Sequence, residues 1–264
     1  MLRLLLIVLA SGALTGCFVQ GNWIPTIWGG QALEDGVIEG DCDVRVDAFV
    51  LSVTQGALLT ADGTASAVLP GNQLFDVARP GPQSMASIDV KKGVYPETVW
   101  FLGAAEEPGP SELLGRGQLI GSDNAGSDMN PILGNATAEQ RDTMIEARAV
   151  LLVEGSIACL SKVDRDPVER TFSWPIQDEA AALRCQNPDL EIVGGSFGAS
   201  TLAVAGEEMF DGSDGLTNEV LWASGADGVI TPDDVGAWFP TLMGRVRLSF
   251  STADERCAWE RLEE

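Results

Sequence analysis

The stretch that decides the fold is residues 42–53, which read CDVRVDAFVLSV. Apolar and polar side chains alternate at first, as they do in a β-strand with one buried face. From residue 48 onward the apolar residues become consecutive, which is typical of a strand covered on both faces. We therefore expect a strand that becomes fully buried along its length. One face carries Val44, Val46, Ala48 and Val50, and Phe49, Leu51 and Val53 join from the other face.

Other short apolar runs continue this pattern along the chain. Turns rich in Gly and Pro separate the early runs, and few segments have helical periodicity. This combination predicts a mainly β protein, built as a two-sheet antiparallel sandwich with a few short helices. The further candidate strands are Ala65–Leu69, Ser87–Val90, Thr98–Leu102, Ala149–Val153 continuing towards Leu160, Thr171–Ile176, Thr201–Ala205 and Gly244–Ser251.

Two segments give the clearest local signals. In Gly244–Ser251, Val246, Leu248 and Phe250 fall on one side of an alternating pattern, which predicts a strand with one wet face. A helix is expected to start at Thr137, whose hydroxyl can cap it while the side chain of Gln140 reaches back to the cap. This helix should end near residue 147, where the next β run begins.

The first residues have the form of an export signal. Arg3 is followed by the apolar run 4–10, which is too short to span a bilayer of roughly 30 Å. The sequence Leu14-Thr15-Gly16-Cys17 then resembles the lipobox of bacterial lipoproteins. This resemblance implies that residues 1–16 are a signal peptide and that Cys17 is acylated and anchors the protein to a membrane. Phe18, instead of Asp, follows Cys17, which favours the outer membrane of a Gram-negative cell.

The charge balance excludes one class of partner. The chain has 39 Asp and Glu against 16 Lys and Arg, a formal net charge of −23. Nucleic acid is therefore not expected as a partner, because its phosphates would be repelled. The sequence does not identify a protein or glycan partner.

Four cysteines follow the lipobox, namely Cys42, Cys159, Cys185 and Cys257. An even number in an exported chain predicts two disulfides. Their spacing leaves all three possible pairings open. Buried free thiols are one alternative, and a zinc site is another, although closely spaced cysteine pairs and histidines are both missing from the sequence.

Histidine does not occur in this sequence, which limits the possible chemistry. Residues 194–198, GGSFG, match the G-x-S-x-G pattern of a nucleophile elbow around Ser196. A serine nucleophile needs a base to accept its proton, and no imidazole exists in the chain to do so. We interpret the motif as a glycine-rich turn that precedes a strand, and we expect no catalytic residue.

The C-terminal part contains a segment similar to an EF-hand. Gly228 takes the sharp-turn position, Ile230 the apolar position two residues later, and Thr231 would cap a second helix. Carboxylates remain only at Asp227 and Asp234, because Ala223 and Gly225 occupy the first ligand positions. Two acids predict calcium binding no tighter than the millimolar class, or a loop that is purely structural. No other cofactor is expected.

The composition divides the chain into four parts. Residues 1–16 form the signal peptide. Residues 17–31 read as a lipid-anchored tether, with an edge strand as the alternative, because this segment combines Gly21, Pro25, Gly29 and Gly30 with Trp23 and Trp28. Residues 32–210 form the β-sandwich, with a long polar loop at 103–136 that is expected to be disordered. Residues 211–264 contain the EF-hand-like segment and a terminal strand.

The chain is similar to bacterial lipoproteins that carry a β-sandwich domain of unknown function. This resemblance covers residues 42–240 and implies fold and location only. We expect a non-enzymatic cell-envelope lipoprotein that presents its acidic sandwich for binding or structural contact. A weak calcium-dependent module and a carboxylate-based hydrolase are the alternatives. The matching pieces are the lipobox at Cys17, Val44–Val53, Ile88–Leu102 with Lys92-Gly93-Val94-Tyr95, Phe172-Ser173-Trp174 followed by Cys185, and Leu202–Phe210.

Overall fold

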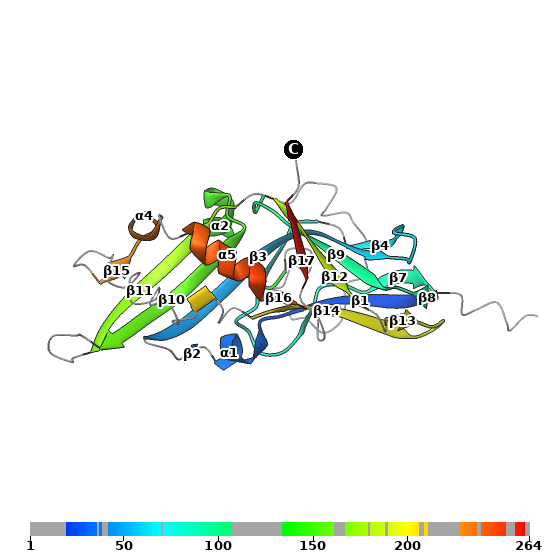
Figure 1. The fold of residues 1–264 in the computed structure, drawn as a ribbon, viewed down its shortest axis with the longest axis horizontal. Helices are drawn as coiled ribbons and strands as arrows, with labels where there is room; N and C mark the ends of the chain where they lie inside the picture. The colour runs from blue at the N-terminus through cyan, green and yellow to red at the C-terminus, as the bar shows by residue number, and fades with distance from the viewer. Residues whose placement is uncertain are drawn as a thin grey trace, which may run out of the picture.

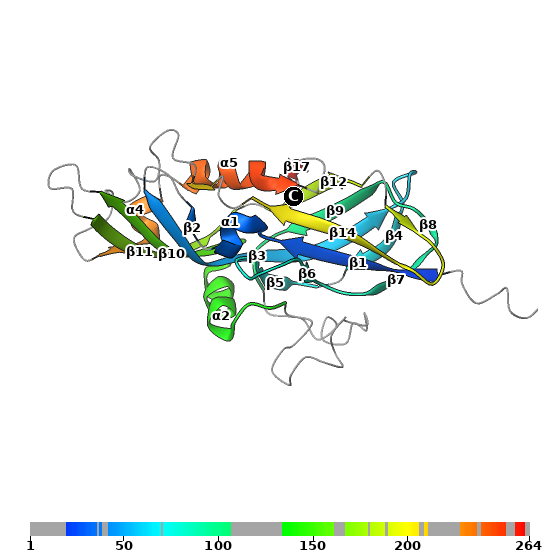
Figure 2. The same cartoon turned by 90° about the horizontal axis from the view of Figure 1, so that it is seen from below.

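The protein is mainly β, as predicted (Figures 1 and 2). Its strands form two large sheets and one two-stranded sheet. No helix in the part of the chain covered by the structure has the length and apolar character needed to cross a bilayer. The computed structural model describes residues 20–35, 37–38, 42–69, 71–106, 134–160, 167–178, 180–187, 190–205, 209–210, 228–236, 239–251 and 257–261.

The larger sheet has ten strands and is organised around β3, a strand of 17 residues. β3 pairs antiparallel with β10 along its first half and with β9 along its second half. This strand contains the predicted run 44–53. The main path runs β15 (Val229–Ile230), β11 (Pro167–Ile176), β10 (Leu151–Leu160), β3 (Asp43–Leu59), β9 (Glu97–Leu102), β12 (Ala181–Gln186) and β17 (Ala258–Arg261), and β2 (Val37–Ile38), β4 (Ala65–Leu69) and β5 (Gln73–Asp76) also pair with β3.

A β-bulge in β3 corrects the predicted faces of this strand. Consecutive residues of β10, Glu154 and Gly155, pair with Ala48 and Val46, so Asp47 is an extra residue in β3. An extra residue moves all following side chains to the opposite face. A Cβ on Gly155 would lie 1.9 Å from the carbonyl oxygen of Arg45, so glycine is needed here. The main core therefore receives Val44, Val46, Phe49, Leu51 and Val53, whereas Ala48 and Val50 enter a second core.

The smaller sheet has β1 at its centre, which corrects the predicted tether. β1 pairs in parallel with β14 on one side and antiparallel with β6 and β7 on the other. The alternative of an edge strand is also wrong, because β1 has partners on both sides. The members of this sheet are β1 (Gln20–Trp28), β6 (Gln83–Ser84), β7 (Ile88–Lys91), β14 (Phe197–Val204) and β16 (Phe250–Ser251), and β8 (Gly93–Val94) and β13 (Glu191–Ile192) form the two-stranded sheet.

Three of the residues that suggested a tether, Gly21, Trp23 and Pro25, are buried in β1. Gly21, Trp23, Pro25 and Ile27 alternate along the strand and are all buried. Pro25 lies between the positions that pair with β7 and those that pair with β6. A proline can occupy such a gap because no antiparallel partner requires its missing N–H. Gly and Pro are therefore part of this strand and do not interrupt it.

The two sheets pack face to face around aromatic side chains. Trp23 of β1 and Trp100 of β9 belong to different sheets, and their ring centroids are 6.2 Å apart. The indole N–H of Trp23 donates to the hydroxyl of Ser200 at 2.8 Å, so its polar atom is satisfied inside the core. Such packing of two sheets over one apolar core is that of a β-sandwich.

Helix α2 (Ala138–Ala147) covers the opposite face of the larger sheet, where it encloses the second core. It begins with the predicted capping box of Thr137 and Gln140. Met144 is fully buried against Ala48, Val50 and their neighbours. This helix explains why β3 is buried on both faces.

The C-terminal part adds edge strands to both sheets and contains two further helices. These are α4 (Pro232–Val235) and α5 (Phe239–Ser249), while α1 (Gly30–Asp35) follows β1. The predicted strand Gly244–Ser251 is wrong over residues 244–249, which belong to α5, whereas its last two residues form β16. The buried residues of α5, Leu242, Met243 and Val246, have helical spacing, and Pro240 is tolerated because it lies in the first turn.

Candidate functional site

The predicted site residues fall into two groups. Cys17 and Asp227 lie outside the described residues, as do Ala223 and Gly225. Asp234 and the four remaining cysteines are described. Most of the predicted loop 103–136 also lies outside them, apart from residues 103–106 and 134–136.

The four cysteines form two disulfides, Cys42–Cys159 and Cys185–Cys257. The prediction of two disulfides is confirmed, and the structure selects one of the three pairings. Each bridge extends an antiparallel ladder by one position, since the β3–β10 register ends at Asp43 and Ala158 and the β12–β17 register at Arg184 and Ala258. The bridges link residues separated by 117 and 72 positions in sequence.

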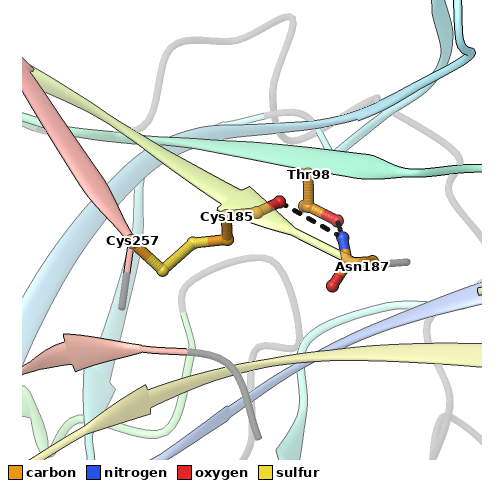
Figure 3. The surroundings of a disulfide bond; sticks show 4 residues. All are labelled: Thr98, Cys185, Asn187 and Cys257. Carbon is orange, nitrogen blue, oxygen red and sulfur yellow. Dashed lines mark hydrogen bonds between the residues drawn. A yellow bond between two sulfur atoms is a disulfide. The ribbon is translucent and has the colours of Figure 1, made fainter. Parts of the chain in front are cut away.

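The second disulfide lies beside a partly buried polar contact (Figure 3). The side-chain amide of Asn187 donates to the hydroxyl of Thr98 and to the carbonyl of Cys185. Thr98 is fully buried on β9, so this contact satisfies a hydroxyl that has no access to water. The bridge joins the end of β12 to the residue that precedes β17, beside this contact.

The described fold begins three residues after Cys17, the predicted acylation site. Gln20, the first described residue, pairs with Lys91 of β7, and its carbonyl accepts the N–H of Gly195 at 2.8 Å. Gly21 is packed so closely that an added Cβ would lie 2.6 Å from the side chain of Ile192. Three residues after Cys17, the backbone is therefore part of the smaller sheet.

Ser196 occupies a turn, as predicted for the Gly194–Gly198 motif. Its hydroxyl donates to the carbonyl of Val193 at 2.8 Å and accepts the N–H of the same residue at 3.2 Å. Gly195 has a φ of 75°, which glycine adopts without strain. Strand β14 begins at the next residue, Phe197.

The EF-hand-like segment docks on the larger sheet. Gly228 has a positive φ of 88°, consistent with its predicted turn position, and Ile230 pairs with Phe172 of β11 in parallel. The carbonyl of Ile230 accepts the indole N–H of Trp174 at 3.1 Å. The described end of this segment is thus fixed by main-chain pairing.

Asp234 closes the cap of α4. Its carboxylate accepts the N–H of Thr231 at 2.8 Å and the hydroxyl of Thr231 at 2.6 Å. The Thr231 hydroxyl, and then its backbone N–H, lower the pKa of the Asp234 carboxyl from its ordinary value. The predicted metal ligand therefore already has hydrogen-bonding partners within its own helix start.

Asp76 is a buried carboxylate that sequence reasoning missed. Its Oδ1 accepts the N–H of Phe49 at 3.1 Å and that of Ala78 at 3.2 Å. Its Oδ2 lies 3.4 Å from the amide nitrogen of Gln140 and 3.6 Å from Arg79. These partners use both oxygens, so Asp76 holds β3, β5 and α2 together. The available signal was an acid inside the apolar run 74–77.

The described residues contain no group of three or more His, Cys, Asp or Glu placed to hold a metal ion. Three comparisons with known proteins, using family models, curated sequences and solved structures, found no match to this chain. The function must therefore be argued from the chain's own residues. The predicted acylation site, Cys17, lies three residues ahead of core strand β1 in the sequence.

Proposed function

We propose that the protein is a non-enzymatic lipoprotein of the cell envelope, anchored through Cys17, which presents an acidic β-sandwich for binding or structural contact. The observation that carries this proposal is the sequence Leu14-Thr15-Gly16-Cys17, which ends three residues before β1. Cleavage before Cys17 would leave the whole described fold intact. The acylated residue would then be joined to the sandwich by only two intervening residues.

The two disulfides support export. Disulfides persist in oxidising compartments such as the periplasm and are rare in the cytosol. Closing one loop of roughly 100 residues lowers the entropy of the unfolded chain, which stabilises the fold by about 4.7 kcal/mol in the loop-entropy model. Reduction should therefore destabilise the domain strongly. In this proposal the protein resides at the outer membrane of a Gram-negative cell.

The charge of the domain constrains its partner. A net charge of −23 is compatible with a basic or cation-rich protein or glycan surface and disfavours nucleic acid. Surface carboxylates far from the anchor would be free to make such contacts.

A weak calcium-dependent module is the second candidate. The geometry that favours it is the positive φ of Gly228 followed by Ile230 in a short strand and Thr231 as a helix cap. Occupancy of Asp234 by its own helix cap keeps the expected affinity in the millimolar class. Calcium titration at fixed ionic strength, with magnesium as control, would test it. A rise in melting temperature at micromolar calcium alone would replace the primary proposal.

The primary proposal is tested by the fate of Cys17. Wild-type protein should partition into the detergent phase and carry acyl chains on Cys17 by mass spectrometry. Cys17→Ala should remain in the aqueous phase. Ser11→Ala, a leader variant outside the lipobox, provides the matched control and should behave like wild type. Detergent partitioning of Cys17→Ala would refute the anchor.

A further inference from the structure

Three segments meet at one end of the long axis of the molecule (Figures 1 and 2). They are Gln20–Asn22, Lys91–Val94 and Glu191–Phe197, and we call them together the amino-terminal tip. Gln20 pairs with Lys91, Asn22 pairs with Phe197, and β8 pairs with β13. The tip is therefore held together by main-chain ladders. It contains Gln20, which lies three residues after Cys17.

The amino-terminal tip carries unusually exposed apolar side chains. Val94 is 56% exposed, Val193 is 52% exposed and Phe197 is 68% exposed. They are three of the five large apolar side chains that are exposed in the described part of the chain, and the other two are Val68 and Val229. Exposed apolar groups gathered in one place mark contacts with a protein or a membrane.

The charges of the tip differ from those of the whole chain. Its three segments contain Lys91, Lys92 and Glu191 as their charged residues, and all three are exposed. Lys91 and Lys92 are two of the three lysines in the sequence. Asp89 lies beside them and accepts a hydrogen bond from Asn22. The local balance is thus close to neutral, whereas the chain as a whole is strongly acidic.

Chain length sets how far the tip can be from the anchor. Three residues span at most about 11 Å when fully extended. The polar interfacial region on each side of a bilayer is roughly 5–8 Å thick, given a total of about 40–45 Å around a core of about 30 Å. An acyl chain on Cys17 would therefore keep Gln20 within about one or two interfacial widths of the hydrocarbon. The intervening residues, Phe18 and Val19, are apolar as well.

We propose that the amino-terminal tip contacts the lipid surface directly, with Val94, Val193 and Phe197 at the level of the headgroups and the upper acyl chains. This inference rests on the proposed anchor at Cys17. Lys91 and Lys92 face anionic headgroups, and the near-neutral tip limits the repulsion that the rest of this acidic domain would experience. The contact fixes the orientation of the sandwich, with its opposite end, at β15 and α4, directed away from the membrane.

The test uses the full lipidated protein in vesicles of phosphatidylethanolamine and phosphatidylglycerol. The five cysteines of the chain are Cys17 and the four disulfide cysteines, so an added cysteine can be labelled selectively. Phe197→Cys receives a polarity-sensitive fluorophore, and lipids with a nitroxide on the acyl chain serve as quencher. Val229→Cys is the matched control, because Val229 is also exposed but lies on β15 (Figure 1).

We expect quenching several-fold stronger at position 197 than at position 229. Equal, weak quenching at both positions on protein that stays bound to vesicles would overturn the tip contact while leaving the anchor intact. If the fluorophore at position 197 reports an apolar environment even without vesicles, the tip contact with lipid would be overturned in favour of a protein partner. If mass spectrometry finds no acyl chain on Cys17, the proposed function fails, and the tip contact fails with it.

A second measurement, hydrogen exchange, uses the unlabelled protein, so its result does not depend on the folding of a cysteine variant. We compare wild-type protein on vesicles with the Cys17→Ala variant in detergent-free solution. Backbone amides of residues 91–94 and 191–197 should exchange with solvent several-fold more slowly in the vesicle-bound protein. The double variant Lys91→Glu, Lys92→Glu should lose this protection on vesicles containing phosphatidylglycerol and keep it on phosphatidylcholine alone. Unchanged exchange in wild type would contradict the proposal.

Discussion

Helices α2 and α4 begin with the same local motif in very different surroundings. In both, a threonine caps the helix and the side chain three residues later accepts the N–H of that threonine, at 2.8 Å in each case. The threonine hydroxyl in turn accepts the backbone N–H of the residue three positions later, at 3.2 Å in α2 and 3.4 Å in α4. The pairs are Thr137 with Gln140, and Thr231 with Asp234.

The difference lies in what the third residue can do beyond the cap. Gln140 has an amide group that donates as well as accepts, and it is only 9% exposed. Its nitrogen reaches Asp76 and connects the helix start to β5 and β3. Asp234 has a carboxylate that only accepts, and its hydrogen bonds are made to Thr231. An amide therefore turns a local cap into a tertiary contact, whereas the carboxylate keeps it local.

The largest effect should come from removing the buried partner of Gln140. Asp76→Ala deprives the N–H groups of Phe49 and Ala78 of their acceptor, and each unsatisfied buried donor costs about 1–3 kcal/mol. We expect a loss of about 3 kcal/mol in the free energy of unfolding, measured by urea titration. Asp142→Ala removes an exposed acid from the same helix and should change stability by less than about 0.5 kcal/mol. Equal effects would contradict the structural role of Asp76.

The second prediction tests the amide itself. Gln140→Glu preserves the capping acceptor, since Glu suits this position, but places a carboxylate against Asp76. We expect a loss of about 2 kcal/mol at neutral pH from like-charge repulsion in this buried site. Gln140→Ala is the control, because it removes the amide without placing a second carboxylate beside Asp76.

These two capping boxes also show what sequence can predict. Thr137 with Gln140 and the cap at Thr231 were predicted because the information lies within four residues. The strand around residues 44–53 was predicted from its own apolar pattern, and the number of disulfides was predicted from the even count of cysteines that follow Cys17. Asp76 and the pairing of the cysteines were not, because both depend on segments that the fold brings together over 27 to 117 positions.

Two errors have a more local cause. Val246 and Phe250 are four positions apart, a spacing that fits both an alternating strand and one face of a helix. Leu242 and Met243 are buried in the same core, and this arrangement fits the helix α5 better than a strand. Their burial depends on the neighbouring sheet, which the sequence of this segment does not reveal. In β1, Gly21 and Pro25 read as breaks, although close packing and a gap between partner strands make both residues suitable there.

A smaller and purely local effect is expected at α4. Thr231→Ala removes a cap and should cost about 1 kcal/mol, or roughly a fivefold increase in local exchange of the first-turn amides. Because the cap hydrogen bonds of Thr231 and Asp234 stay within α4, the global unfolding midpoint should change little. Thr137→Ala should have the opposite profile, with a measurable change in global stability. Hydrogen exchange and urea titration on both variants separate the two cases.

The smallest effect concerns acid. Hydrogen bonds from the hydroxyl and then the N–H of Thr231 lower the pKa of the Asp234 carboxyl below its ordinary value of 3.8. A lowered pKa means that the folded state binds the proton less readily than the unfolded state. The contribution of Asp234 to the start of α4 is therefore fully present above the ordinary pKa and is lost as the pH falls through the lower, folded pKa.

The amide proton of Thr231 should report this in an NMR titration, with a midpoint below 3.8. Asp234→Asn should abolish the transition, whereas Asp233→Asn, which changes the exposed neighbour, should preserve it. A midpoint at or above the ordinary value would mean that the Thr231 hydrogen bonds do not hold the charged carboxylate in solution, and the contrast with the uncharged cap of α2 would have to be abandoned.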